Sequence, residues 1–300
     1  MQWAKRRKSK TFAPRSLNRG NMRWITNINW HHRLFLLLVL LVSSHILSAQ
    51  TGFVYGLTGH NLVLVNVENG ELTPLHKLEG LPANAELRNL VYIPKDQAFY
   101  TTINFRSNPG LVRIRATGEW ELIGVLQLSG TVPHFCEALT YDPDKDQLLV
   151  SVSLDGNIRQ DKKSEAILVV DRQTARCELA ATIRQVPAPD DFDEMAVFEG
   201  RLFGLDGVPE TATTYIYPFN LQHLDGRELF AGTKQNIPYF TMDDVVVIGH
   251  LLYFPDAKTQ GWYFFDLRGR RWYELGKVHG PASLGKIKLT GLAYLPLSQA

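Results

Sequence analysis

Short apolar segments and polar turns alternate along most of this chain, and one such unit recurs about every 50 residues. Its clearest copy runs from Glu137 to Pro143 (EALTYDP), passes through a turn of Asp and Lys, and continues as the apolar segment 147–153. An apolar segment, a turn and a second apolar segment form the pattern of a β-hairpin. Further copies begin at Arg88, Asp193, Asp243 and Thr290. Repeats of this length indicate propeller blades rather than solenoid turns.

The two ends of the chain supply complementary parts of one blade. Residues 53–57, 61–67 and 71–75 read as three strands, and the Asn69-Gly70 turn between the last two is a strong hairpin signal. The missing first strand is available at residues 289–295. The sequence therefore predicts an all-β fold, a single five-bladed β-propeller closed by pairing of its N- and C-terminal strands in one blade. Six blades are the alternative count.

Two local features refine this prediction. Pro218 lies inside the apolar segment after Thr214, and because proline removes a backbone donor we expect that strand to be short or bulged.

Cys136 and Cys177 fall on the first and last strands of one repeat. Two intervening strands at about 4.8 Å spacing separate them too far for a disulfide, so we expect two buried thiols.

The first 50 residues differ from the rest and resemble a secretion signal. They contain nine Lys and Arg and no acid, then an apolar run at 34–42 and small residues up to Ala49. A basic region, a short apolar region and a small residue before the cleavage site define a signal peptide. We predict cleavage near Ala49 or Gln50, with Met22 as an alternative start and a retained membrane anchor as the alternative fate. Residues 51–300 then form a secreted, periplasmic or extracellular propeller domain.

Removing this segment reverses the charge balance. The whole chain has 32 basic and 30 acidic residues, whereas residues 51–300 have 23 and 30. The mature protein is mildly acidic and has no basic stripe, which argues against nucleic acid as a partner. We expect a monomer that binds a small molecule, a glycan or a protein, and that meets a membrane only through an uncleaved signal.

Aligning the five repeats separates polar from apolar positions. The third to fifth positions are mostly apolar, whereas the first two are rich in acids. Because first strands line a propeller's channel and start at one mouth, we expect these polar residues to gather there as a ligand site: Arg88, Asn89, Glu137, Asp193, Glu194, Asp243 and Asp244. Clustered oxygen ligands suit Ca²⁺, with Asn89, Glu137, Asp193 and Asp243 as the candidate metal ligands. The alternative is that these side chains are satisfied by backbone N–H groups or by water.

The repeat EALTYDP at 137–143, with LLVS at 148–151 and ILVVD at 167–171, resembles the repeats of gluconolactonase and regucalcin-like calcium propellers and of related binding propellers. That resemblance implies calcium bound through Glu, Asn and Asp at the channel mouth, to which Glu137, Asn89 and Asp193 or Asp243 could correspond. The chain departs from those enzymes in having five repeats and in placing Arg88 in the ring.

Three functions follow from these observations. The first is a non-catalytic secreted binding module that recognises its ligand at the channel mouth, with or without calcium. The second is a calcium-dependent lactonase or esterase in which one acid acts as general base. The third is an inverting glycosidase that uses two of the carboxylates. Acids paired to backbone groups or to Arg88 would favour the first.

Overall fold

The structure is a computed structural model that describes residues 52–104, 108–154, 165–183, 192–220, 228–229 and 235–296. The chain divides into two units, residues 1–49 and 50–300, and every described residue belongs to the second. The predicted signal peptide, including Met22 and the cleavage region, lies outside the described residues. No helix in the described ranges has the length and apolar character needed to span a bilayer.

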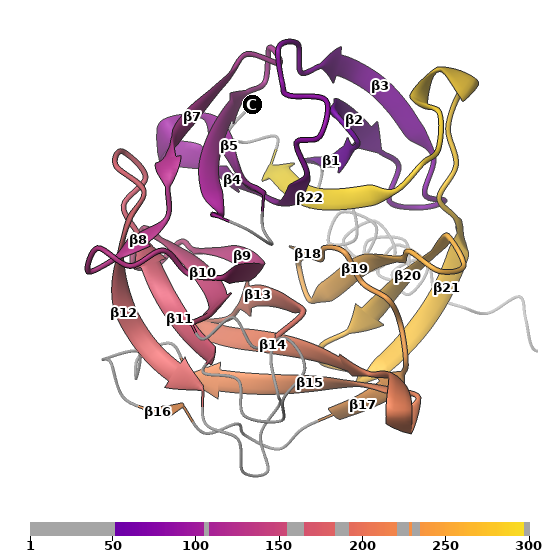
Figure 1. The fold of residues 1–300 in the computed structure, drawn as a ribbon. Helices are drawn as coiled ribbons and strands as arrows, with labels where there is room; N and C mark the ends of the chain where they lie inside the picture. The colour runs from indigo at the N-terminus through magenta and orange to yellow at the C-terminus, as the bar shows by residue number, and fades with distance from the viewer. Residues whose placement is uncertain are drawn as a thin grey trace, which may run out of the picture. The chain divides into compact units, whose positions relative to one another are not determined.

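Five antiparallel sheets form the blades of a propeller, as the repeat pattern predicts (Figure 1). Blade 1 combines both ends of the domain: β22 (Leu289–Pro296), β1 (Gly52–Thr58), β2 (Asn61–Val65) and β3 (Leu72–Lys77). Blade 2 contains β4 (Leu87–Ile93), β5 (Ala98–Ile103), β6 (Gly110–Arg115) and β7 (Trp120–Val125). Blade 3 contains β9 (Phe135–Asp142), β10 (Gln147–Ser153), β11 (Glu165–Val170) and β12 (Arg176–Ile183), to which β8 (Gln127–Leu128) and β16 (Glu228–Leu229) add parallel.

Blade 4 contains β13 (Glu194–Phe198), β14 (Arg201–Val208), β15 (Thr213–Asn220) and β17 (Gln235–Pro238). Blade 5 contains β18 (Val246–Ile248), β19 (Leu251–Asp256), β20 (Gly261–Asp266) and β21 (Arg271–Lys277). In the described part of the chain, single 3₁₀ turns occupy Pro94–Asp96, Pro209–Thr211 and Ala282–Leu284. The inner strands β22, β4, β9, β13 and β18 surround the centre of the ring in Figure 1.

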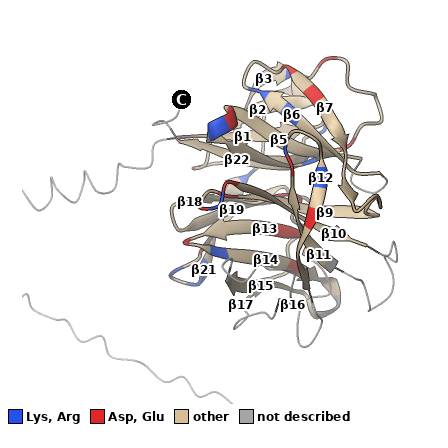
Figure 2. Ribbon diagram, turned by 90° about the vertical axis from the view of Figure 1, so that its left-hand side faces the viewer, with Lys and Arg blue, Asp and Glu red and all other residues tan. Residues whose placement is uncertain are grey.

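The hydrophobic core consists of five layers, one between each pair of neighbouring blades. Both faces of a blade are covered, so successive residues of a strand enter different layers. On β10, Leu148, Val150 and Val152 pack toward blade 2, whereas Leu149 packs toward blade 4. This double burial explains why the strands read as short apolar runs. In the side view of Figure 2, most of each strand is tan, the colour of residues other than Lys, Arg, Asp and Glu.

Pairing of β1 with β22 closes the ring, and this part of the prediction is confirmed. The two strands are antiparallel over their whole length, from Gly52 opposite Pro296 to Thr58 opposite Leu289. Cys136 and Cys177 are buried free thiols, also as predicted.

The prediction for the strand containing Pro218 is wrong. β15 runs through this residue for eight residues and pairs with β14 without a register shift. Pro218 lies beyond the four positions that β17 covers, so in the described sheet it occupies an edge, where proline is tolerated.

Candidate functional site

The predicted polar residues lie where the inner strands begin, and several of these strands bulge there. One extra residue interrupts the pairing at Asn89 or Leu90 in β4, at Glu137 in β9 and at Thr290 in β22. A bulge turns side chains away from the regular alternation and is frequent at the rims of closed sheets. Asn89 also adopts a positive φ of 60°, which asparagine tolerates better than most residues. We call the seven predicted residues at this end of the channel the polar mouth.

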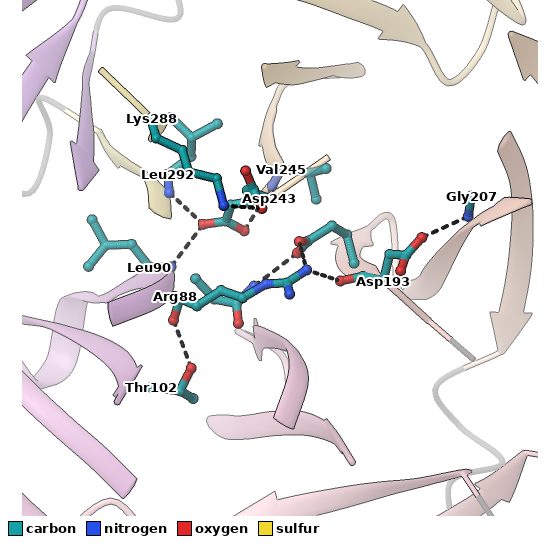
Figure 3. A network of polar contacts seen from close by, with 12 residues as sticks. Arg88, Leu90, Thr102, Asp193, Gly207, Asp243, Val245, Lys288 and Leu292 are labelled. Atoms are coloured by element: carbon teal, nitrogen blue, oxygen red, sulfur yellow. Dashed lines mark hydrogen bonds and ion pairs between the residues drawn. The ribbon is translucent and has the colours of Figure 1, made fainter. Parts of the chain in front are cut away.

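A buried ion pair crosses the channel at the polar mouth (Figure 3). Arg88 Nη2 lies 3.2 Å from Glu194 Oε1, and Asn89 Nδ2 donates to Glu194 Oε2 at 2.9 Å. Arg88 and Asn89 belong to blade 2 and Glu194 to blade 4, which are not neighbours in the ring, so the contact spans the channel. Burial raises the pKa of Glu194 well above its usual range, although Arg88 opposes the shift. Burial alone would lower the pKa of Arg88, but the charges of Glu194, Glu137 and Asp243 raise it.

Asp244 connects three blades through its carboxylate. Its Oδ2 accepts the N–H of Leu90, at 2.8 Å, and the N–H of Leu292, and its Oδ1 accepts the N–H of Val245 at 2.8 Å. The side chain is buried, and loss of water raises its pKa to about 8 against the opposing effect of these three donors. Asp244 is therefore bound to the inner strands of blades 1 and 2 from its own position ahead of β18.

The remaining predicted acids lie around this centre. Asp193 Oδ2 accepts the N–H of Gly207 at 2.8 Å, and Asp243 Oδ1 lies 3.1 Å from Lys288 Nζ. Glu137 is half-buried on β9, and its charge acts on Arg88. The structure thus brings the seven residues to one end of the channel, but it gives most of the acids protein partners.

Calcium would require the oxygens of Asn89, Glu137, Asp193 and Asp243 to converge on one point. Within the described ranges, no three His, Cys, Asp or Glu side chains form a group that could hold a metal ion. Asn89 Oδ1 and Asp243 Oδ2 are nevertheless buried with no hydrogen-bond partner among the described residues. These two oxygens could serve as ligands for a cation at the polar mouth.

Next to the polar mouth along the inner strands lies a cavity of about 250 Å³ that we call the well. Its walls are the third, fourth and fifth aligned positions of all five inner strands, with Pro143 added at the rim. The members are Leu90, Val91, Tyr92, Leu139, Thr140, Tyr141, Met195, Ala196, Val197, Val245, Val246, Val247, Leu292, Ala293 and Tyr294. The repeat alignment marks every one of these positions as inner strand, but their apolar character indicates core and conceals the cavity.

The fifth position makes the outer end of the well unequal around the ring. Blades 1, 2 and 3 supply Tyr294, Tyr92 and Tyr141, whereas blades 4 and 5 supply Val197 and Val247. One side of the well therefore carries three phenols, and the other side is aliphatic.

At the tyrosine end of the well, ion pairs connect the turns of blades 2 and 3. Asp146 lies 2.7 Å from both Lys95 and Arg172, and Arg172 Nε lies 2.8 Å from Asp96. The hydroxyl of Tyr141 donates to Asp146 at 2.9 Å. Arg172, Lys95 and Tyr141 together lower the pKa of Asp146, so this carboxylate is ionised at neutral pH.

Comparison with known proteins identifies the fold class of this chain but not its family. No protein-family model matches the chain, and no curated protein matches it. A chain in the crystal structure of the nidogen/laminin complex is similar with a TM-score of 0.50, at 14% identity over 83% of this chain and 100% of that one. TolB from Acinetobacter baumannii gives a TM-score of 0.49, at 10% identity over 89% and 73%. At such identities the likeness concerns the propeller fold alone.

Replacing Glu194 by Ala is expected to destabilise the fold strongly, because the largely buried Arg88 would lose the carboxylate that it contacts at 3.2 Å. Loss of one partner of a buried pair typically costs about 3–5 kcal/mol. The matched control is Glu199→Ala, which removes an exposed pair with Arg268 and should cost less than about 1 kcal/mol. Urea unfolding measures both, and equal effects of the two substitutions would contradict the proposed importance of the crossing ion pair.

Stability should fall as the pH rises from 5 to 8, because the pKa of Asp244 is about 8 in the folded protein against an ordinary value of 3.8. Over this interval the native state holds the proton more tightly than the unfolded state, so the free energy of unfolding decreases with pH. Asp244→Asn removes this contribution and should reduce the difference between urea unfolding at pH 5 and at pH 8. An unchanged difference would show that Asp244 does not titrate as described.

Proposed function

We propose that this protein is an exported, non-catalytic binding module that takes a small molecule into the well. The observation that carries the proposal is the open volume of about 250 Å³ enclosed by all five inner strands. A concave site lined mainly by apolar side chains with a few polar groups is the usual form of a small-molecule site. Because all five blades contribute, the site exists only in the closed ring.

The chemistry of the polar mouth supports binding rather than catalysis. A general base must reach the proton it removes, yet Glu194 and Asp244 have 0% and 1% of their surface exposed. Their oxygens accept bonds from Arg88, Asn89 and backbone N–H groups. These acids therefore serve to hold the blades together, which argues against both a lactonase and a glycosidase that would use them.

Export is proposed from the first 50 residues, whose basic, apolar and small segments follow each other in the order of a signal peptide. The mildly acidic propeller would then work outside the cytoplasm, in the periplasm or beyond the cell.

A library of small molecules can test this proposal through methionine methyl groups labelled with ¹³C. Met195 lies in the wall of the well, whereas Met242 is buried between blades 4 and 5 and does not line it. Ligands of the well should shift the Met195 methyl resonance saturably and leave that of Met242 in place. Val197→Trp should abolish these shifts by filling the well, and Leu122→Trp, at an exposed position on β7, should preserve them.

Two results would contradict the proposal. One is a library in which no compound moves the Met195 resonance. The other is binding that survives in Val197→Trp, provided that an unchanged Met242 resonance shows the variant to be folded. Val247→Phe fills the well from blade 5 instead of blade 4 and serves as a second variant if Val197→Trp does not fold.

A calcium site at the polar mouth is the second candidate, favoured by the unpartnered oxygens of Asn89 and Asp243. A cation there would stabilise the folded protein by RT ln(1 + [L]/Kd), about 2.7 kcal/mol at a hundredfold excess over Kd. Millimolar calcium should then raise the melting temperature, and Asp243→Asn should remove most of the increase. If calcium does not raise the melting temperature of the wild-type protein, this candidate is eliminated. A catalytic function would require a separate result, namely turnover of a lactone that Glu137→Gln abolishes.

A further inference from the structure

We infer that the ligand of the well is an uncharged molecule of about ten non-hydrogen atoms, with an apolar body and a hydroxyl or carbonyl group directed to the tyrosine side. This inference rests on the proposed function, since it names the chemical class that the same cavity accepts. It follows from the charge, the hydrogen-bonding groups and the volume of the well.

The charge of the ligand is constrained by the walls. Among the described residues, no Lys, Arg, His, Asp or Glu lines the well. On the inner strands, Asp142 follows Tyr141 but is buried and accepts the N–H of Asp144 at 3.0 Å, and in the polar mouth Arg88 already contacts Glu194. At the other end, Asp146 pairs with both Lys95 and Arg172. A charged ligand would therefore lose its water without gaining a counter-charge, which is costly in an apolar site.

The hydrogen-bonding capacity of the walls is small and one-sided. Apart from Thr140, the side chains with a hydroxyl are Tyr92, Tyr141 and Tyr294, on three consecutive blades. The hydroxyl of Tyr141 already donates to Asp146. Burial raises the pKa values of Tyr92 and Tyr294, so both phenols keep their protons at neutral pH and can donate to a ligand oxygen.

The inner strands add backbone groups to this set. Each of them is the end strand of its sheet, paired on one side only. The N–H and C=O groups on the other edge face the channel, and a ligand hydroxyl can exchange bonds with them as water does. A purely hydrocarbon ligand would leave those groups without partners, which is why a single polar group belongs to the inferred class.

The volume sets the size. A cavity of about 150 Å³ accommodates benzene, so about 250 Å³ has room for a ring with a short substituent. Val197 and Val247 offer the ring an aliphatic surface opposite the tyrosines. These features together orient the ligand, with its ring against blades 4 and 5 and its polar group toward blades 1 and 2.

Four probes of similar size separate charge from polarity: benzyl alcohol, toluene, benzoate and benzylammonium. Each is titrated into the protein while the methyl resonances of Met195 and Met242 are followed. Benzyl alcohol should shift Met195 alone and should bind at least tenfold more tightly than benzoate or benzylammonium. It should also bind several-fold more tightly than toluene, because toluene lacks the hydroxyl.

Tyrosine variants test the orientation. In the double variant Tyr92→Phe and Tyr294→Phe, the advantage of benzyl alcohol over toluene should shrink, with toluene affected little. Tyr273→Phe, at an exposed position on β21, is the matched control and should leave both affinities unchanged. An undiminished advantage in the double variant would overturn the assigned role of the two phenols.

The outcomes distinguish this inference from the proposed function. If benzoate or benzylammonium binds as tightly as benzyl alcohol, the inferred class is wrong although the well still binds ligands. If none of the four probes shifts Met195 but other library compounds do, the class is again wrong and the site remains. If the whole library leaves Met195 unmoved, both the class and the proposed function are refuted.

Discussion

Two buried carboxyl groups at the centre of the ring, those of Glu194 and Asp244, are the groups on which the arrangement of the blades depends. Removing a carboxylate from water is costly unless donors replace the lost solvent. Blade 2 supplies Arg88, Asn89 and the N–H of Leu90, and blade 1 supplies the N–H of Leu292. These donors reach the acids only when the blades stand in the closed ring, so the network favours that one arrangement over looser ones.

Much of this architecture could be predicted from the sequence because its causes are local. Strands buried on both faces give short apolar runs, and turns such as Asn69-Gly70 separate them. The repeat spacing then counts the blades, and the alignment identifies the positions of the inner strands. Pro218 shows the limit of such reasoning, since its effect depends on how far β17 extends beside β15. That extent is a tertiary property with no local signal.

The roles of the polar residues could not be predicted in the same way. Glu194 and its partners Arg88 and Asn89 are 106 and 105 residues apart in the sequence, and Asp244 is 154 residues from Leu90. Nothing near these acids in the chain indicates which of them will meet an arginine, a backbone N–H or solvent. The bulges at Glu137 and Thr290 add to the difficulty, because one extra residue changes the direction of every side chain beside it. The apolar side chains of the inner strands indicated a filled core, whereas the structure shows that they line the well. The sequence does not distinguish the two cases, because the same side chains can line a cavity or fill a core.

The closure of the ring by β1 and β22 has a consequence for the time course of folding. β1 is made early, but its partner lies roughly 230 residues further along the chain, which at about 5–20 residues per second is an interval of roughly 10–50 s. During that interval blade 1 has no inner strand and the edge of β1 is unpaired, so the domain cannot reach its final cooperative state. Contacts of such long sequence separation also slow folding itself. A chain of this topology stays incompletely folded until its last strand is synthesised.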